Sequence, residues 1–473
     1  SPAKPRSWKL RQAGDMRVDE AEITRREAGL RPGLSRAQMT MIGLGGAIGT
    51  GLFMGSGIAI GYAGPAVIIS YAIAAFIAVC MVLSLSEMAV MHPAAGSFGA
   101  YAETYLTPWV GFLVRYTYWM AQIVAVGGEA VAAGVYMTYW FPGTPLWMWS
   151  TGFTVILTYV NSRSVHSFGS FEYWFAMIKV TAIVAFIILG ASALLGIGQP
   201  AVGFHNLTGL PGGFMPNGFH GVWMGVIMGI FSFTGTELIA VTSGETPDPK
   251  KSIPAALRSM AVRLGLFYVL ALTIVVSFVP WTETGAKLVE QSPFVKVFHH
   301  VGLQHAAGLM NFVVLSAALS GMNANIYLAS RMLFSLGRGS FAPTVFGRLN
   351  KDGAPTPAIV ASGLGIMAMA AISKLTPLAY NYLFGIATFG AIFTWIVIIL
   401  SHLSFRRRHR PEELPVRMPF FPWMQLAGLA LLIGILVTMG LDTDFWNISW
   451  IIGVPWLVLL SVSYVIWKRV RKA

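Results

Sequence analysis

Long apolar stretches recur along the whole chain, and they constrain its fold more than any other feature. The hydrocarbon core of a bilayer is about 30 Å thick, so a helix that crosses it needs roughly 20 consecutive apolar residues. Twelve stretches of approximately this length are present, at residues 39–61, 65–90, 109–139, 146–162, 171–197, 218–243, 259–280, 305–334, 356–373, 378–403, 422–440 and 449–467. We therefore predict an all-α integral membrane protein with 12 transmembrane helices.

Composition supports this class and excludes a soluble protein. Of the 473 residues, 55% are hydrophobic and only 11% are charged, which lies far outside the range of soluble globular domains. The polar segments between the apolar stretches are short, so we predict one transmembrane domain over residues 39–467. Residues 1–38 and 468–473 are expected to be cytosolic tails. The single cysteine, Cys80, leaves no partner for an internal disulfide.

Positive charge is distributed unevenly between the two sides of this topology. If the N-terminus is cytosolic, about 27 of the 32 Lys and Arg residues fall on the inner side or at inner helix ends. This asymmetry follows the positive-inside rule, so we expect a multi-pass protein of the cytoplasmic (inner) membrane with both termini cytosolic. The net charge of +13 is then assigned to contacts with membrane lipids, through segments such as 404–417 and 467–473, and not to nucleic acid. No obligatory protein partner is inferred.

Two of the apolar stretches carry an unusual glycine pattern. The first contains "MIGLGGAIGTGLF" at residues 41–53, in which five of the thirteen residues are glycine. The sixth contains "MGIFSFTGTELIAV" at residues 228–241, where a Gly-Thr step precedes the ionisable Glu237. Five apolar stretches lie between the start of the first stretch and the start of the sixth. Because five is an odd number, the half of the chain that begins with the sixth stretch would be inverted in the membrane relative to the first half. Glycine-interrupted helices at matching places in two inverted halves indicate the central binding site of a transporter.

This pattern predicts two inverted five-helix repeats, over about 39–197 and 218–403, with helices 1 and 6 unwound and two extra helices within 422–467. Non-helical backbone at membrane depth is tolerated only where protein or a water-filled cavity satisfies its N–H and C=O groups. Each break would present amides with partial positive charge and carbonyls with partial negative charge, a pair that suits a zwitterion. The alternative is that the glycines serve only close helix packing.

The helix ends also predict which groups would hold such a ligand. A substrate carboxylate would bind the amides near Thr50 and Gly51, whereas an ammonium group would bind the carbonyl oxygens of Ala47, Phe231 and Thr234. Glycine lets the ligand approach the backbone because no Cβ stands in the way.

Several further motifs give the chain a resemblance to a known family. They are "GAIGTGLFMGSG" at 46–57, "AGPA" at 63–66, "SEMAV" at 86–90, "GSFGAYAE" at 96–103, "FEYWFAMIKV" at 171–180, "GGFMPNGF" at 212–219, "FSFTGTEL" at 231–238, "SGETPDPKKSIPAA" at 243–256 and "SRMLFSLGRGSFAP" at 330–343. Together they resemble the amino acid–polyamine–organocation superfamily, and within it the prokaryotic amino acid permeases, over nearly the whole chain from Leu34.

The resemblance implies α-amino acid transport by alternating access, commonly coupled to protons, with no cofactor or metal and no enzymatic activity. It places an aromatic gate over the substrate at Phe231, and it assigns the carboxylate-binding amides and ammonium-binding carbonyls to the positions reached from the helix ends. The predicted substrate-binding residues are Ala47, Ile48, Gly49, Thr50, Gly51, Glu129, Phe231, Ser232, Phe233, Thr234, Gly235 and Asn323.

Two ionisable residues lie deep within apolar stretches and are the candidates for proton coupling. Lys179 lies eight residues into its stretch, about 12 Å of helix rise from the start. In relatives a lysine here takes the place of a sodium ion between helices 1 and 8, so Lys179 is expected either to exchange a proton or to brace helix 1 with a fixed charge. Glu129 could contact the substrate ammonium, exchange a proton, or only accept hydrogen bonds from neighbouring helices.

Other polar residues have simpler expectations. Glu237 is expected to have either a functional role past the break or a structural partner such as a lysine or a backbone N–H. Arg115 is expected to snorkel inward, and Glu87 is expected to lie at the interface. Asn323 would line the path opposite helix 1, or bridge helices by a hydrogen bond. Glu245 lies in a rigid cytosolic turn.

The sequence leaves the substrate and the coupling open. "FSFTG" favours neutral side chains of small to medium size, while a cationic side chain could pair with Glu129. Alternatives to proton-coupled uptake are exchange of amino acids, a sodium symport that Lys179 would disfavour, and a sensor that binds without transport. A membrane enzyme would need a nucleophile and base or metal ligands at helical spacing, and the nine histidines form no such set.

Overall fold

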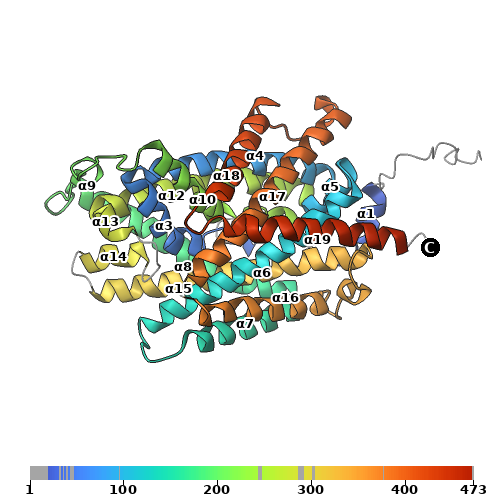
Figure 1. Cartoon of the computed structure of the whole chain (residues 1–473), viewed down its shortest axis with the longest axis horizontal. Helices are drawn as coiled ribbons and strands as arrows, with labels where there is room; N and C mark the ends of the chain where they lie inside the picture. Colours follow the sequence, from blue (N-terminus) through green and yellow to red (C-terminus); the bar gives the residue numbers. More distant parts are fainter. Residues whose placement is uncertain are drawn as a thin grey trace, which may run out of the picture.

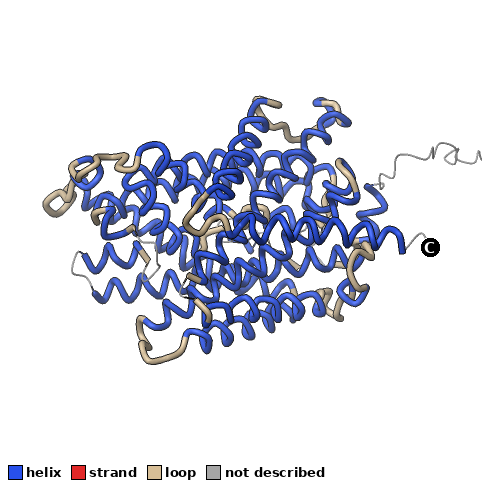
Figure 2. The backbone as a smooth tube through the Cα atoms, in the orientation of Figure 1, coloured by secondary structure: helices blue, strands red, loops and turns tan. Residues whose placement is uncertain are grey.

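The computed structural model describes residues 20–30, 33–35, 37–38, 41–42, 47–94, 96–242, 248–285, 292–300, 304–376 and 378–470. These residues form helices and connecting loops, without strands in the described ranges (Figure 2). The main helices, one in each of the twelve apolar stretches, are α3 (Ser56–Ala63), α4 (Val67–Met91), α6 (Pro108–Thr138), α7 (Leu146–Arg163), α8 (Val165–Leu195), α10 (Gly218–Phe233), α12 (Pro249–Phe278), α15 (Gln304–Arg338), α16 (Thr356–Ala370), α17 (Ala379–Arg408), α18 (Trp423–Leu441) and α19 (Ile448–Val470).

Other helical segments connect or extend them. They are α1 (Glu20–Arg26), η1 (Gly51–Gly55), η2 (Gly64–Ala66), α5 (Ser97–Tyr105), α9 (His205–Thr208), α11 (Leu238–Val241), α13 (Trp281–Thr284), α14 (Pro293–His300), η4 (Thr344–Gly347), η5 (Ala371–Lys374) and η6 (Pro411–Glu413).

The all-helical membrane class predicted from the sequence is confirmed. Helical residues lie in each of the twelve apolar stretches, and eight helices of the described part are long and apolar enough to cross a bilayer. One of these eight, Gly51–Met91, runs through the first two predicted stretches, while Leu264–Phe278 and Thr356–Ala370 are shorter apolar helices. The count of twelve crossings and the inverted repeats stay predictions.

Local sequence signals explain where the long helices begin and end. α6 starts at Pro108, whose fixed φ suits a first helical position, and the Thr107 side chain accepts a hydrogen bond from the Val110 amide at 3.2 Å. α8 starts after Ser164, which caps the Ser167 amide at 3.1 Å. It ends at Gly196, which has a left-handed backbone with φ of 76°.

The helices form a central group and a peripheral pair. α6 contacts α15, α17, α16 and α7, and α4 contacts α12 and α10. In the most apolar 18-residue windows of α6 and α15, 89% of residues are buried, compared with 28% in α18 and 17% in α19. A helix that stays apolar while exposed needs lipid around it. α18 and α19 therefore lie at the periphery, and α19 runs along the outside of α6 (Figure 1).

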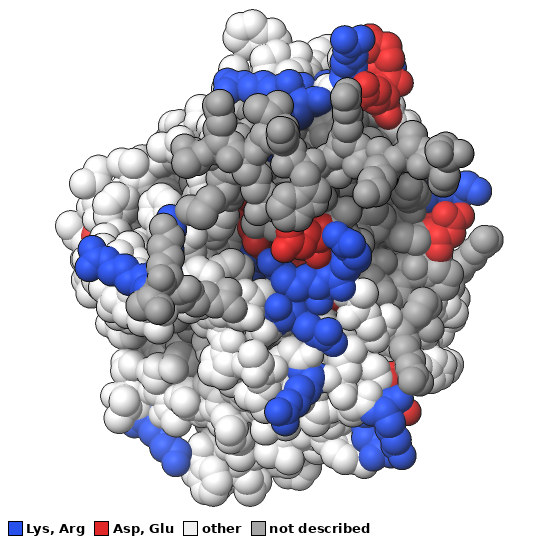
Figure 3. Space-filling view, turned by 90° about the vertical axis from the view of Figure 1, so that its right-hand side faces the viewer, with Lys and Arg blue, Asp and Glu red and all other residues white. Residues whose placement is uncertain are grey.

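Both ends of the described chain lie at one end of the bundle. α1 and the last turn of α19 are found there, whereas α9, α13 and α14 lie at the opposite end (Figure 1). The last turns of α1, α15, α17 and α19 all carry Lys or Arg. Figure 3 shows basic side chains spread over this end of the molecule, with a central group in which basic and acidic side chains meet.

The expectation that Arg115 snorkels inward is wrong, because Arg115 belongs to a buried group of basic and acidic residues near α1. Its guanidinium does not reach solvent: it is fully buried and pairs with Glu103 at 2.9 Å and with Glu27 at 3.3 Å. Arg26 adds two parallel hydrogen bonds to Glu103, at 3.1 and 2.9 Å. Two carboxylates therefore compensate the buried arginine, so it need not snorkel.

Glu87, which is expected to lie at the interface, is covered by protein. Glu87 is buried, because side chains from a distant part of the chain cover it. Its carboxylate lies 2.6 Å from His402 Nε2 and 3.5 Å from Arg406 Nε, and it accepts a hydrogen bond from the Met418 amide. Glu87 thus ties α4 to α17 and to the segment before α18.

Candidate functional site

α10 ends at Phe233 because the next two residues leave the helical conformation. Thr234 is extended, with φ of −63° and ψ of 143°, and Gly235 has φ of 96°. This positive φ favours glycine, since a Cβ would strain the backbone there. Glu237 closes the turn: its Oε2 accepts a hydrogen bond from the Gly235 amide at 3.2 Å, and its Oε1 accepts one from the Tyr118 hydroxyl at 2.7 Å. The break predicted in the sixth stretch is present, and Glu237 has the backbone partner that was one of its two expectations.

The first stretch is interrupted as well. Residues 47–49 are not helical, and helical structure resumes at Thr50. Residues 43–46, which also belong to the glycine-rich pattern, lie outside the described residues. Gly51–Gly55 then form a turn of π-helix, η1, before α3 continues. Such turns are rare and are found frequently at functional sites.

The two interrupted helices touch each other beside their breaks. A Cβ built on Gly51 would lie 2.8 Å from Ser232 Cα and 3.1 Å from Phe231 Cδ1, so only glycine permits this approach. Tyr71 of α4 also joins the two segments, because its hydroxyl lies 2.9 Å from Ser232 Oγ and 3.4 Å from the Gly51 carbonyl oxygen. Backbone from distant parts of the chain thus meets at one place inside the helix bundle.

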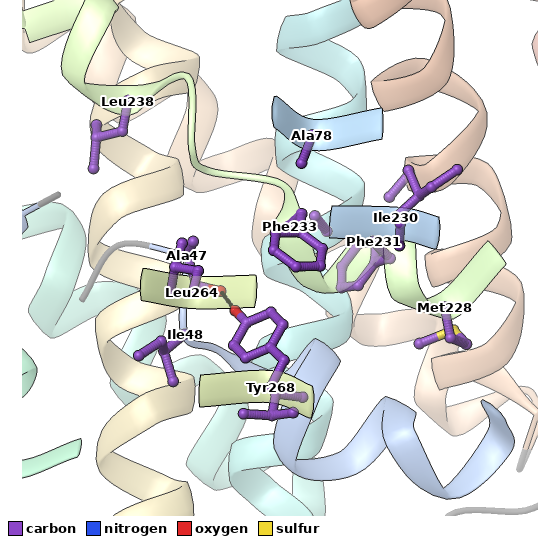
Figure 4. Packing of buried hydrophobic residues seen from close by; sticks show 14 of the residues in the cluster. Ala47, Ile48, Ala78, Met228, Ile230, Phe231, Phe233, Leu238, Leu264 and Tyr268 are labelled. Atoms are coloured by element: carbon purple, nitrogen blue, oxygen red, sulfur yellow. Dashed lines mark hydrogen bonds between the residues drawn. The ribbon is translucent and has the colours of Figure 1, made fainter. Parts of the chain in front are cut away.

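Protein hydroxyl groups occupy two of the carbonyls predicted to bind an ammonium. The Tyr268 hydroxyl of α12 lies 2.9 Å from the Ala47 carbonyl oxygen (Figure 4). It also lies 2.8 Å from the Ser232 carbonyl oxygen. The Phe231 carbonyl accepts hydrogen bonds from Thr234 Oγ1 at 2.6 Å and from the Thr234 amide at 3.1 Å. The carbonyl oxygens of Ala47 and Phe231 therefore already act as hydrogen-bond acceptors.

Aromatic side chains form a wall beside the breaks. The ring of Phe231 lies 4.0 Å from that of Phe384, centroid to centroid, and Phe384 lies 4.0 Å from Tyr380. The Tyr380 hydroxyl donates to the Thr50 carbonyl at 3.3 Å. Thr50 Oγ1 and the Tyr136 hydroxyl oxygen are among the buried hydroxyl oxygens that have no hydrogen-bond partner among the described residues.

Glu129 of α6 faces the break in the first stretch. A Cβ on Gly49 would lie 3.3 Å from Glu129 Oε1, and a Cβ on Gly321 of α15 would lie 2.3 Å from the same atom. Asn325 Nδ2 donates to Glu129 Oε2 at 3.3 Å. Glycines on two other segments, Gly49 and Gly321, therefore leave room for this carboxyl, which lies between them.

Lys179 of α8 connects the first break with α15. Its Nζ donates to the Ile48 carbonyl oxygen at 2.8 Å and to Ser320 Oγ at 2.5 Å, and the side chain is fully buried. This position between the first and eighth stretches is the one that the resemblance implied. Through these two hydrogen bonds Lys179 braces the first break against α15.

Glu172 is a partner of Lys179 that the sequence reasoning missed. Its Oε1 lies 3.8 Å from Lys179 Nζ and accepts a hydrogen bond from Ser320 Oγ at 2.6 Å. Its Oε2 accepts a hydrogen bond from Asn323 Nδ2 at 3.4 Å, and Asn323 Oδ1 in turn accepts one from Asn161 Nδ2 at 2.9 Å. The Asn323 side chain thus joins α15 to α8 and α7, which favours the helix-bridging interpretation over a place on the substrate path.

The missed residues had a weak signal in the sequence. Glu172 lies seven residues before Lys179, which places both on one face of a helix. Tyr71, Tyr268 and Tyr380 each interrupt an apolar run with a hydroxyl, and a buried hydroxyl needs a partner. Such signals show that partners exist but not which ones. Glu245 lies outside the described residues, so the expected cytosolic turn has no structural counterpart here.

Comparison with known proteins connects this arrangement to a family. Residues 38–473 match the amino acid permease family. The chain is 40% identical to the uncharacterized amino acid permease YtnA of Bacillus subtilis over 92% of this chain and 95% of the relative. It is 39% identical to the gamma-aminobutyric acid permease of the same organism, over 94% and 95%, and 38% identical to the aromatic amino acid transport protein AroP of Escherichia coli O6:H1, over 94% and 97%. By their names these relatives are permeases and transport proteins, and not enzymes. The chain belongs to the amino acid permease family.

Proposed function

We propose that this permease takes up neutral L-α-amino acids across the cytoplasmic membrane by alternating access, coupled to the inward movement of protons. The architecture proposed for it has 12 transmembrane helices in two inverted five-helix repeats plus two extra helices. Both termini lie on the cytosolic side, an orientation supported by α1 and the end of α19 sharing one basic end of the bundle (Figures 1 and 3).

The observation that carries the proposal is the contact of two interrupted helices at Gly51 and Ser232. Helix ends at membrane depth supply amides on one side and carbonyls on the other, which matches the charges of an α-amino acid. In the proposed complex the substrate carboxylate binds the Thr50 and Gly51 amides, and the ammonium displaces the Tyr268 hydroxyl from the Ala47 carbonyl. Ile48, Gly49, Ser232, Phe233 and Gly235 shape the backbone of the site.

The side-chain pocket is proposed to lie against the aromatic wall. Phe231 acts as the gate over the substrate, and the contact of its ring with Phe384 supports a site for apolar or aromatic side chains. Glu129 is proposed to contact the ammonium or to exchange a proton, and Asn323 holds the neighbouring helices. The names of the relatives, which include carriers of aromatic amino acids and of gamma-aminobutyric acid, support substrates without net charge.

Uptake into proteoliposomes tests this function. Radiolabelled L-phenylalanine, L-threonine, L-arginine and gamma-aminobutyric acid are supplied one at a time, with and without an imposed pH gradient that is acidic outside. We expect a neutral amino acid to accumulate above its external concentration only with the gradient, and protein-free vesicles to show no accumulation. Counterflow that the gradient does not change would identify an exchanger, and preference for arginine would identify a cationic permease. Binding without flux would identify a sensor.

A further inference from the structure

We propose that Lys179, Ser320 and Glu172 form a proton relay, in which Glu172 receives the proton that Lys179 releases. This inference rests on the proposed proton-coupled function and names the groups that would carry the coupling. Glu172 is then a residue of the coupling machinery and not only a neighbour of the lysine.

The three side chains form one directed chain of hydrogen bonds. Lys179 Nζ donates to Ser320 Oγ at 2.5 Å, and Ser320 Oγ donates to Glu172 Oε1 at 2.6 Å. Lys179 and Glu172 lie on the same helix, α8, seven residues and thus about 10.5 Å of rise apart. The lysine and glutamate side chains nevertheless approach within 3.8 Å, and the serine from α15 lies between them. All three residues are fully buried.

The transfer that this chain permits is balanced. An N–H bond of the Lys179 ammonium breaks, and its proton joins Ser320 Oγ. The hydroxyl proton of Ser320 passes to Glu172 Oε1, so the serine ends as it began. The ammonium becomes an amine and the carboxylate becomes a carboxylic acid. Two opposite charges are replaced by two neutral groups, which is favourable where water is excluded because buried ions lose their hydration.

The transfer would change the hold on the first break. In the charged state Lys179 also donates to the Ile48 carbonyl at 2.8 Å, and a hydrogen bond from an ammonium is roughly twice as strong as one from a neutral donor. Once Lys179 is neutral, its hold on the Ile48 backbone weakens. The protonation state of the relay would thus bias the position of the interrupted helix that carries the proposed carboxylate site.

The remaining surroundings hold Glu172 in place and leave its Oε1 for the relay. Asn323 Nδ2 binds the other oxygen, Oε2, and Asn161 orients Asn323. The other acidic group whose charge acts on Lys179 is Glu129 of α6, which has its own partner in Asn325. The competing interpretation is a permanent ion pair, in which Glu172 only keeps Lys179 charged.

Glu172→Gln separates the two interpretations. Glutamine keeps the size of the side chain and an acceptor for Ser320, but it cannot receive a proton. In the proteoliposome assay we expect this variant to keep counterflow of radiolabelled L-phenylalanine or L-threonine, whichever the unaltered protein accumulates, and to lose accumulation on the pH gradient. Glu87→Gln is the matched control: it makes the same change at a buried carboxyl of α4 outside the relay, and it should retain gradient-driven accumulation.

A second pair of variants tests the middle of the chain. Ser320→Ala removes the hydroxyl and should lose gradient-driven accumulation, whereas Ser320→Thr restores a hydroxyl and should regain it. This pair decides the question if Glu172→Gln fails to fold, as judged by thermal unfolding in detergent.

The outcomes separate failure of the relay from failure of the function. Accumulation by Glu172→Gln at the level of the unaltered protein overturns the relay and leaves transport intact. Loss of counterflow in a folded Glu172→Gln protein also overturns it, because Glu172 would then serve the conformational change itself. Equal accumulation on the pH gradient by Ser320→Ala and Ser320→Thr would also overturn the relay. Absence of both counterflow and accumulation in the unaltered protein would contradict the proposed function instead.

Discussion

The hydroxyl oxygen of Tyr268 lies 2.9 Å from the carbonyl oxygen of Ala47, so a side chain of α12 occupies the acceptor that we assign to the substrate ammonium. Tyr268→Phe removes this donor, so the buried carbonyl oxygens of Ala47 and Ser232 lose a hydrogen-bond partner. We expect the free energy of unfolding of the ligand-free protein to fall by about 1–3 kcal/mol. A substrate would then meet no competitor at Ala47, so its stabilising effect on thermal unfolding should increase.

Tyr71→Phe is the control for this change. Tyr71 contacts Ser232 Oγ and the Gly51 carbonyl, neither of which is assigned to the ammonium. Tyr71→Phe should lower the free energy of unfolding without enlarging the rise in unfolding temperature that the substrate causes. If Tyr268→Phe shows the same shift as the unaltered protein, the ammonium does not bind at Ala47.

Gly51 provides the sharpest steric test of the site. The sequence predicts that Gly51→Val abolishes binding in a folded protein, but the structure shows that even a methyl group would meet Ser232 Cα at 2.8 Å. We therefore expect Gly51→Ala to abolish or strongly weaken binding of L-phenylalanine or L-threonine, and to lower the unfolding temperature, because the breaks must separate. Gly152→Ala on α7 meets nothing within 4 Å and should leave binding unchanged, with stability equal or higher by up to about 1 kcal/mol. Binding by Gly51→Ala at the affinity of the unaltered protein would contradict the placement of the carboxylate.

The sequence was sufficient to locate the interruptions but not their partners. Gly235 can be recognised in the sequence, because a left-handed backbone within an apolar helix needs glycine and because Glu237 follows it. The positions of Tyr268 and Glu172 relative to the breaks depend on how α12 and α15 pack, which hydropathy does not encode. Burial of Arg115 and Glu87 was missed for the same reason: their partners Glu27 and His402 come from segments 88 and 315 residues away. Charge patterns assign a side of the membrane, but not the contacts that cover a charge there.

Lys179 offers a test of the buried ion pair that does not need transport. Lys179→Ala leaves the Glu172 carboxylate buried without its counter-charge, and breaking such a pair costs about 3–5 kcal/mol of folding stability. The double variant Lys179→Met, Glu172→Gln removes both charges and should recover most of this loss. Thermal unfolding in detergent measures the stability of the single and the double variant. Equal stability of the single and double variants would show that the two side chains are not coupled.

The same residue also tests the coupling in vesicles. If Lys179 exchanges protons, Lys179→Ala should keep counterflow and lose uptake driven by a pH gradient. If the variant still accumulates substrate on the gradient, Lys179 is a fixed brace of the first break.

The last prediction concerns pH and the group of charges that joins α1 to α5 and α6. Burial acts to raise the pKa of Glu103, but the charges of Arg115 and Arg26 outweigh it and hold the pKa below its ordinary value of 4.5. A carboxyl with a lowered pKa contributes stability above its ordinary pKa, and this contribution is lost as the pH falls through the lowered value. We expect the unfolding temperature of the unaltered protein to drop as the pH falls below about 4.5. Glu103→Gln should be less stable at pH 7 and should lose less of its stability on acidification. Parallel pH profiles of the unfolding temperature for the two proteins would show that Glu103 does not contribute. The segment around Arg26 should also be cleaved more readily by limited proteolysis at pH 7 in the variant, because the two hydrogen bonds from Arg26 to Glu103 hold that segment against α5.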